Sequence, residues 1–214
     1  MEILNDHQRS KIDESDDSFF YAQPKFVYHL DSNFRNYLKD VYKEEIKANS
    51  VIIDLMSSWD SYLPLNQNYK KVIGHGLNKA ELEKNKSLDR YWIQNFNISQ
   101  VIPIENQSID YCLMVAAWQY LQYPEKITEE ISRILKSDGK FLISFSNRAF
   151  WTKAPNIWTN SSEEERIDYI RSVLISNGFQ EPKIIKKFLK NNISFLPFLN
   201  KDPFYCLIAK KESN

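Results

Sequence analysis

The chain is 214 residues long, 43% of them are hydrophobic, and 28 basic residues balance 28 acidic ones. This size is typical of one domain with a sizeable core and a short appendage. A formal net charge of zero gives no electrostatic reason to expect a nucleic-acid partner, and no run of about 18 apolar residues indicates a membrane helix. No apolar segment follows Met1 as a signal peptide requires, so we expect a cytoplasmic protein.

The N-terminal segment differs in composition from the rest of the chain. Residues 1–18 are polar and acidic, which disfavours a packed structure. The aromatic residues Phe19, Phe20 and Tyr21 follow, and we expect them to dock on the core or in a substrate pocket. The predicted organisation is a flexible N-terminal arm, 1–23, and a single domain, 24–214, with its core at 50–211.

The domain is organised around the stretch 49–64, which reads NSVIIDLMSSWDSYLP. A helix precedes it, because Asp31 can act as its cap and apolar residues then recur at a 3.6-residue spacing up to Ile46. The run 51–53 predicts a strand buried on both faces. Asp54 at its carboxyl end would be costly in the core but suits the edge of an open α/β sheet where ligands bind. Local capping by Asp54 is the structural alternative.

Strands and helices alternate along the rest of the chain. A short strand starts at Val72 and is expected to break at 74–76, and Asn78 and Glu81 then have the spacing of a capping box. The later predictions are a strand at 91–93, a strand at 109–115, a helix opened by Pro124, a strand at 140–146, a helix capped by Ser162 and Glu165, and strands at 184–188 and 204–209. Cys112 and Cys206 lie in apolar runs and should be reduced core residues, and no residue cluster has metal-ligand spacing, so no metal is predicted.

The connection between the last two strands differs from the others. Residues 191–202 form little more than a loop, so these strands should pair as an antiparallel hairpin. We therefore predict an α/β fold with a seven-stranded, mostly parallel sheet, a terminal antiparallel hairpin, and helices on both faces.

This order of elements, with an acid ending the first strand, resembles the class I S-adenosylmethionine-dependent methyltransferases, whose sheet is Rossmann-like. The resemblance covers roughly residues 25–210, and the segment 108–140 matches the general pattern of the fourth strand, its helix and the next turn. Four phrases are similar to a subgroup of methyltransferase-like proteins of bacteria and photosynthetic organisms: PKFVYHLD (24–31), DLMSSWDSYLP (54–64), VIGHGLNKAEL (72–82) and SFSNRAFWTKAPNIW (144–158).

The resemblance implies S-adenosylmethionine as the cofactor, with Asp54 acting on its methionine amino group directly or through water. The family's first loop carries three glycines where Met56, Ser58 and Asp60 stand, although Ser57 and Ser58 could offer hydroxyls in exchange.

Gly76 replaces the acid that usually binds the ribose hydroxyls. Asn78 is the nearest polar substitute, with helix capping as its alternative. Asn95 stands where the family often has an acid near the adenine amino group. Ala116 is one of the small residues after the fourth strand, and such residues suit an adenine or a small acceptor.

Five residues are candidates for acceptor binding: Tyr21, His29, Trp118, Arg148 and Lys153. The cationic pair Arg148 and Lys153 could hold a carboxylate or phosphate, and a capping surface loop is the alternative. Trp118 has core packing as its alternative, and His29 a structural hydrogen bond. We expect the segment 19–29 and the loop 147–158 to close together over the cofactor.

The resulting functional prediction is an enzyme that transfers a methyl group to a small-molecule acceptor, without a nucleic-acid or membrane partner. The alternative is a catalytically silent methyltransferase-like module that acts by binding a protein or a nucleotide. A nicotinamide-dependent oxidoreductase is disfavoured, because the chain lacks a G-x-G-x-x-G motif.

Overall fold

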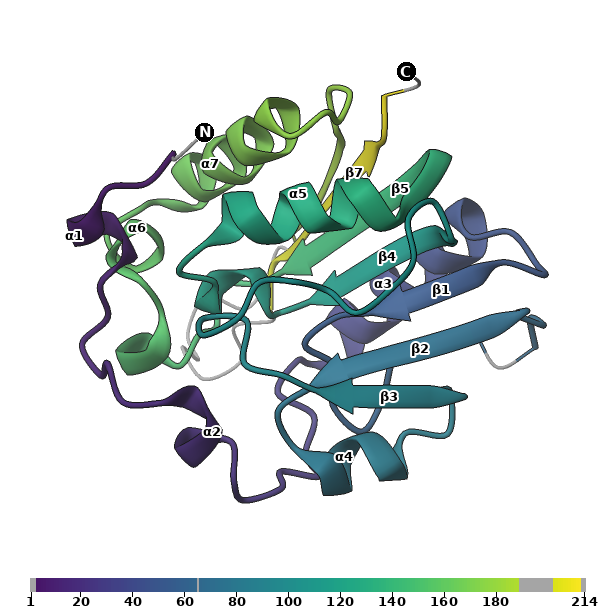
Figure 1. Cartoon of the computed structure of the whole chain (residues 1–214), viewed down its shortest axis with the longest axis horizontal. Coiled ribbons are helices and arrows are strands. Elements are labelled where there is room, and N and C mark those ends of the chain that lie inside the picture. Colours follow the sequence, from purple (N-terminus) through teal and green to yellow (C-terminus); the bar gives the residue numbers. More distant parts are fainter. Residues whose placement is uncertain (1–2, 65, 189–201, 213–214) are drawn as a thin grey trace.

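Seven strands form one mixed sheet in the order β3-β2-β1-β4-β5-β7-β6 (Figure 1). The computed structural model describes residues 3–64, 66–188 and 202–212. The strands are β1 (Val51–Asp54), β2 (Lys71–Gly76), β3 (Arg90–Ile93), β4 (Ile109–Val115), β5 (Leu135–Phe145), β6 (Lys183–Lys187) and β7 (Phe204–Lys210).

The first five strands are parallel, and β7 is antiparallel to both of its neighbours. Cys206 of β7 lies opposite Ser144 of β5 and Ile185 of β6. This confirms the predicted terminal hairpin and the seven-stranded, mostly parallel sheet. The loop predicted between the last two strands lies outside the described residues, apart from Asp202.

Helices cover both faces of the sheet (Figure 1). The longer helices are α3 (Ser32–Glu45), α5 (Pro124–Ile134) and α7 (Glu163–Ser176). The shorter ones are α1 (Asp6–Arg9), α2 (Asp17–Phe20), α4 (Lys79–Lys84), α6 (Asn156–Thr159) and two 3₁₀ turns, η1 (Trp118–Tyr120) and η2 (Trp151–Lys153). Asp31 caps α3 and a complete capping box opens α7, as the sequence predicts.

The core forms two layers because successive strand residues point to opposite faces of the sheet. Ile53 and Ile143 pack in the layer of α5 and α7, whereas Ile52 and Leu142 pack in the layer of α3. Both cysteines are free thiols buried among these residues.

The second strand is longer than predicted and runs through both of its glycines. His75 and Gly76 pair with Trp92 and Ile93 of β3, so the strand does not break. A Cβ built at Gly74 would lie 2.4 Å from Leu88 Cδ1. The glycine therefore permits close packing inside the strand, where the sequence had suggested a turn.

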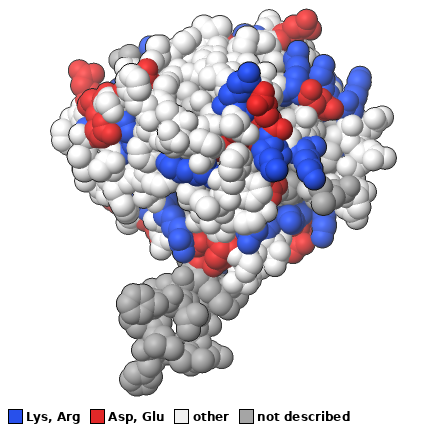
Figure 2. Space-filling model, turned by 90° about the horizontal axis from the view of Figure 1, so that it is seen from below, with Lys and Arg blue, Asp and Glu red and all other residues white. Residues whose placement is uncertain are grey.

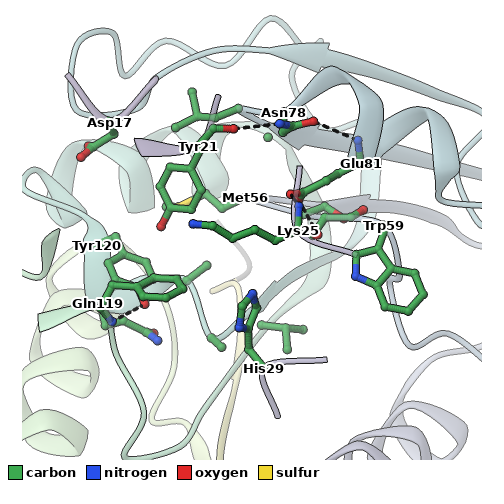
Figure 3. A pocket seen from close by; sticks show the side chains of 18 of the residues that line it. Asp17, Tyr21, Lys25, His29, Met56, Trp59, Asn78, Glu81, Gln119 and Tyr120 are labelled. Atoms are coloured by element: carbon green, nitrogen blue, oxygen red, sulfur yellow. Dashed lines mark hydrogen bonds between the residues drawn. The ribbon is translucent and has the colours of Figure 1, made fainter. Parts of the chain in front are cut away.

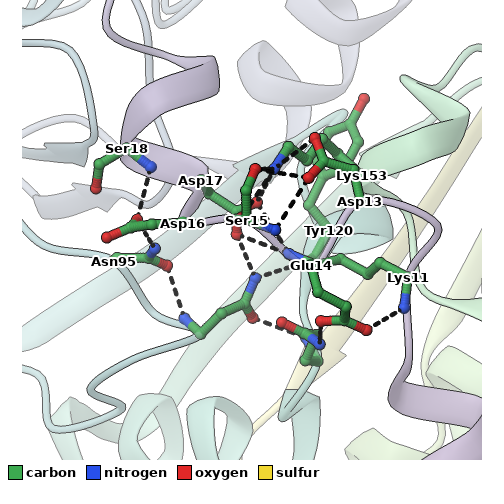
Figure 4. A network of polar contacts seen from close by, with 12 residues as sticks. Lys11, Asp13, Glu14, Ser15, Asp16, Asp17, Ser18, Asn95, Tyr120 and Lys153 are labelled. Atoms are coloured by element: carbon green, nitrogen blue, oxygen red, sulfur yellow. Dashed lines mark hydrogen bonds and ion pairs between the residues drawn. The ribbon is translucent and has the colours of Figure 1, made fainter.

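The N-terminal segment, by which we mean residues 3–29, differs from the flexible arm (1–23) that the polar composition of its first part predicts. Its charged groups form buried ion pairs with each other and with the domain (Figure 4). Lys11 Nζ lies 2.9 Å from Asp17 Oδ1, and Lys153 Nζ lies 3.0 Å from Asp13 Oδ2. Lys153 Nζ also donates to the Ser15 carbonyl oxygen at 2.8 Å. Pairing compensates the cost of burying these charges, so a polar sequence becomes part of the folded structure.

The segment lies at the edge of the sheet where the parallel strands end (Figure 1). Elsewhere Lys and Arg alternate with Asp and Glu, as one face of the molecule shows (Figure 2). Within the described ranges, no helix is long and apolar enough to cross a membrane.

Replacing Lys153 by alanine should destabilise the protein. The side chain is 1% exposed, and its removal leaves Asp13 without its cation, although Asp17 keeps Lys11. We expect a loss of about 2 kcal/mol in the free energy of unfolding, measured by urea denaturation, because the Ser15 carbonyl oxygen loses its donor and Asp17 loses one of its two cations, whereas the partly exposed Asp13 can be hydrated.

The matched control is Lys79→Ala, which breaks an exposed pair with Glu83 on α4 and should change stability by about 0.5 kcal/mol or less. Equal effects of the two substitutions would show that the Lys153 cluster does not hold the segment.

Candidate active site

A cavity of about 670 Å³ lies where β1, β2, β4 and β5 end. The N-terminal segment and the loop after β5 form its other walls. The volume is in the range of small-molecule sites, and the carboxyl edge of an open α/β sheet is where such folds bind ligands.

The structure brings together nine of the eleven residues that the sequence singled out. Those lining the cavity are Asp54, Ser57, Ser58, Asn78, Asn95, Ala116, Tyr21, His29 and Arg148. Trp118 and Lys153 do not line it. Trp118 is 1% exposed and packs with Phe141 and Tyr169, while the ammonium of Lys153 is used by the ion pairs described above. The sequence places both residues after a strand but does not show which way their side chains turn.

Asp54 is buried at the end of β1 and accepts two serine hydroxyls. Ser57 Oγ donates to Asp54 Oδ2 at 2.5 Å, and Ser61 Oγ donates to the same oxygen at 2.6 Å. Burial raises the pKa of Asp54 to about 6, although the two hydroxyls act in the opposite direction. The carboxyl group is therefore mostly ionised at pH 7 and protonated in mild acid.

The first loop is closed by His75 of β2. The backbone N–H of Met56 donates to His75 Nδ1 at 3.1 Å, and that of Ser57 donates to the His75 carbonyl oxygen at 2.6 Å. His75 Nε2 lies 2.8 Å from the Gln94 carbonyl oxygen, which can only accept, and the ring stacks on Phe96 with centroids 3.8 Å apart. Burial lowers the pKa of His75 to about 3, so the ring is neutral with its proton on Nε2. Met56 keeps a left-handed backbone, with φ of 54°, without being glycine.

Gly76 allows the first loop to approach β2. A Cβ at this position would lie 2.6 Å from the Ser57 carbonyl oxygen. No side chain, and therefore no acid, fits at position 76 while the loop has this conformation.

Glu81 is a cavity residue that sequence analysis missed, because its spacing from Asn78 indicates a capping box. Asn78 does cap α4 by accepting the Glu81 N–H at 3.1 Å, but the Glu81 carboxylate does not complete the box. Instead its oxygens accept the Lys25 backbone N–H and the Ser58 hydroxyl, both at 2.6 Å. The carboxylate is thus held at the cavity wall by Ser58 and by the backbone of Lys25, whose side chain lies beside it in Figure 3.

Two predicted cofactor residues also hold the N-terminal segment. The Asn78 amide donates to the Tyr21 and Ala22 carbonyl oxygens, at 2.8 and 3.1 Å. The Asn95 amide donates to Asp16 Oδ1 at 2.9 Å (Figure 4). These contacts tie the ends of β2 and β3 to the segment that covers the cavity.

Arg148 lines the cavity and is ion-paired with Asp202 through Nε, while its side chain stays 58% exposed. Asp202 and Asp31 in turn accept each other's backbone N–H groups, at 2.7 and 2.8 Å. The partner of Arg148 in the structure is therefore a carboxylate of the chain itself.

Comparison with known proteins agrees with this geometry. Residues 60–143 match the family described as methyltransferase domain, a match that covers less than half of the chain and begins at Asp60, within the first loop. No curated protein matches the chain.

Solved structures share the fold at low identity. An S-adenosylmethionine-dependent methyltransferase of Thermotoga maritima is 18% identical, with a TM-score of 0.59 over 85% of this chain and 90% of that one. One from Aquifex aeolicus is 15% identical, with a TM-score of 0.56 over 85% and 99%. Geranyl diphosphate C-methyltransferase of Streptomyces coelicolor is 11% identical, with a TM-score of 0.55 over 84% and 81%. The chain therefore has the fold of S-adenosylmethionine-dependent methyltransferases.

The raised pKa of Asp54 predicts a specific pH dependence of stability. Because the folded pKa of about 6 lies above the pKa of 3.8 of an unperturbed aspartate, the folded state binds more protons between these pH values, and stability falls as pH rises through them. The Asp54→Asn variant should lack this contribution. Urea denaturation at pH 4 and pH 7 should show wild type losing up to about 3 kcal/mol relative to the variant. Parallel pH profiles of the two proteins would contradict the assignment.

Proposed function

We propose that the protein transfers a methyl group from S-adenosylmethionine to a small-molecule acceptor. The observation that carries the proposal is the single cavity at the strand ends, which gathers all six residues expected to contact the cofactor. The match to a methyltransferase domain and the shared fold support it. When bound, the cofactor supplies a methyl group activated by its sulfonium.

The residues around the cavity fit this cofactor, with Glu81 in the role that the resemblance gives to an acid at position 76. Asp54, largely ionised at neutral pH, suits the methionine amino group. Glu81 supplies the acid that position 76 cannot carry and suits the ribose hydroxyls. Each of its oxygens takes one hydrogen bond from Lys25 or Ser58, and a carboxylate oxygen can accept two.

The first loop contributes differently from the glycine-rich loop that the resemblance implies. Its N–H groups at Met56 and Ser57 are already bonded to His75. Side chains rather than backbone amides should therefore make the polar contacts to the cofactor here. The hydroxyl groups of Ser57 and Ser58 line this part of the cavity and point to Asp54 and Glu81.

Methyl transfer requires alignment of the reactants and exclusion of water. The N-terminal segment is placed to provide both, because it contacts the first loop directly. Tyr28 donates its hydroxyl to Asp60 Oδ2 at 3.2 Å, and Trp59 Nε1 donates to the Val27 carbonyl oxygen at 3.3 Å. The Tyr28 and Trp59 rings pack with centroids 4.5 Å apart.

The alternative function, a catalytically silent module, shares the fold and the cavity. The methyltransferase-domain match supports the enzyme over this alternative. Titration with cofactor followed by a turnover assay separates them, since a silent module gives no S-adenosylhomocysteine with any acceptor.

Isothermal titration calorimetry with S-adenosylmethionine and S-adenosylhomocysteine tests the proposal. We expect binding to wild type, its loss in Asp54→Ala, and about a tenfold weaker affinity in Glu81→Gln, the size of one lost charge-assisted hydrogen bond.

The matched control is Glu83→Gln, which neutralises an exposed acid on the same helix and should leave affinity unchanged. No binding by a folded wild-type protein would overturn the proposal. Equal affinity of the Glu81→Gln and Glu83→Gln variants would remove Glu81 from the cofactor site.

A further inference from the structure

We infer that the ligand beside the cofactor is an anion, carrying a carboxylate or phosphate on a flat apolar body, and that Lys25 binds its charge. Calling this ligand the methyl acceptor rests on the proposed function. The inference itself rests on the charges and rings of the cavity.

Lys25 extends from the N-terminal segment across the cavity (Figure 3). Its Nζ lies 4.1 Å from the centroid of the Phe20 ring, 4.9 Å from that of Phe150 and 5.5 Å from that of Tyr21. Among the described residues, this ammonium has no carboxylate within 4.0 Å and no hydrogen-bond acceptor. The aromatic faces replace part of its hydration without neutralising it, so its three N–H donors are available to a ligand.

The described acidic groups around the cavity have other partners than Lys25. Asp17 pairs with Lys11 and Lys153, and Asp60 accepts from the hydroxyl of Tyr28 and the backbone of Tyr62. Asp54 and Glu81 accept the serine hydroxyls described above. A half-buried cation that no protein carboxylate compensates favours an anionic ligand.

Two further groups surround the same space from other elements. His29 packs edge-on against Phe150 with centroids 5.4 Å apart. Burial lowers the pKa of His29 most and the charge of Lys25 comes second, Glu81 acts in the opposite direction, and Arg148 has the smallest effect. Lys25, His29 and Arg148 therefore lie within electrostatic reach of one another. Of these three, Lys25 carries the charge that no described carboxylate pairs, because Arg148 is paired with Asp202 and the lowered pKa of His29 favours its neutral form. Asp54 lies at the end of β1 and Glu81 in the first turn of α4.

The rings around Lys25 indicate the body that carries the anion. Phe150 and Tyr120 line the cavity and lie nearly parallel with centroids 6.1 Å apart, and Phe20, which is not a lining residue, meets Phe150 edge to face at 5.1 Å. Flat rings of this kind pack well against another flat apolar group. An aryl carboxylate or aryl phosphate satisfies both the charge and the rings.

Three probes test the inference by calorimetry on the full chain: benzoate, phenyl phosphate, and neutral benzyl alcohol. Wild type should bind at least one anion about tenfold or more tightly than benzyl alcohol, and the stronger anion identifies the preferred group. Lys25→Met should lose this preference and Lys25→Arg should retain it. The control Lys126→Met removes an exposed lysine that lies 5.2 Å over the Tyr123 ring outside the cavity, and should change nothing.

Cofactor titration of the same variants keeps the two proposals apart. Unchanged cofactor affinity in Lys25→Met, together with loss of the anion preference, supports an acceptor-binding Lys25. Loss of cofactor affinity in that variant would overturn the inference, because Lys25 would then bind the cofactor's own carboxylate. Equal binding of benzyl alcohol and both anions by wild type would also overturn it. Anion binding without any cofactor binding would contradict only the proposed methyl transfer.

Discussion

The cluster of ion pairs around Lys153 is the interaction on which the cavity depends. Lys153 belongs to the turn after β5, and its partners Asp13, Ser15 and Asp17 belong to the N-terminal segment. This contact ties two parts of the chain that are far apart in sequence across the open edge of the sheet. Without it, the segment that carries Tyr21, Lys25 and His29 would keep its hydrogen bonds to Asn78 and Asn95 but lose its link to the turn after β5. Burying so many charges is costly unless they are paired, and here each charge has a partner.

A second constraint acts at the first loop, where His75 accepts the hydrogen bonds of backbone N–H groups that would otherwise be free to face a ligand. His75 accepts one loop N–H through its ring and one through its carbonyl oxygen, and its neutral ring stacks on Phe96. The loop can lie this close only because position 76 is glycine. The close contact between the first loop and β2 therefore has two results. Position 76 cannot carry an acid, and the N–H groups of Met56 and Ser57 are bonded to His75. Glu81, one turn into α4, then carries the carboxylate on this wall.

These two constraints place the cavity's acids and Lys25 on different elements of the structure. The half formed by β1, β2 and α4 contains Asp54 and Glu81, each hydrogen-bonded to serine. The half formed by the N-terminal segment and the loop after β5 contains Lys25, His29 and Arg148 among aromatic rings. A cationic cofactor and an anionic acceptor would each meet the opposite charge in this arrangement. That complementarity would also set their relative orientation, which methyl transfer requires.

The fold could be predicted from the sequence because its signals are local. The buried run before Asp54 predicted β1, the caps at Asp31 and Ser162 predicted α3 and α7, and the short final connection predicted the antiparallel hairpin. The strand ends also placed most candidate site residues correctly at one edge, since all parallel strands end there. The errors arose where side-chain direction or long-range pairing decides. Glu81 has the spacing of a capping box, yet its carboxylate turns to Ser58, and Trp118 follows a strand, yet packs into the core.

The sequence by itself thus determined the succession of strands and helices along the chain, the edge of the sheet at which the cavity lies, and the position of Asp54 at that edge. Hydrophobic periodicity and helix caps carry this information over a few residues. Only the tertiary structure decided that the polar N-terminal segment closes the cavity, that Lys153 anchors it, and that Lys25 reaches the cavity without a carboxylate partner. Those outcomes depend on ion pairs between residues more than a hundred positions apart, and such pairing leaves no periodic signal in the sequence.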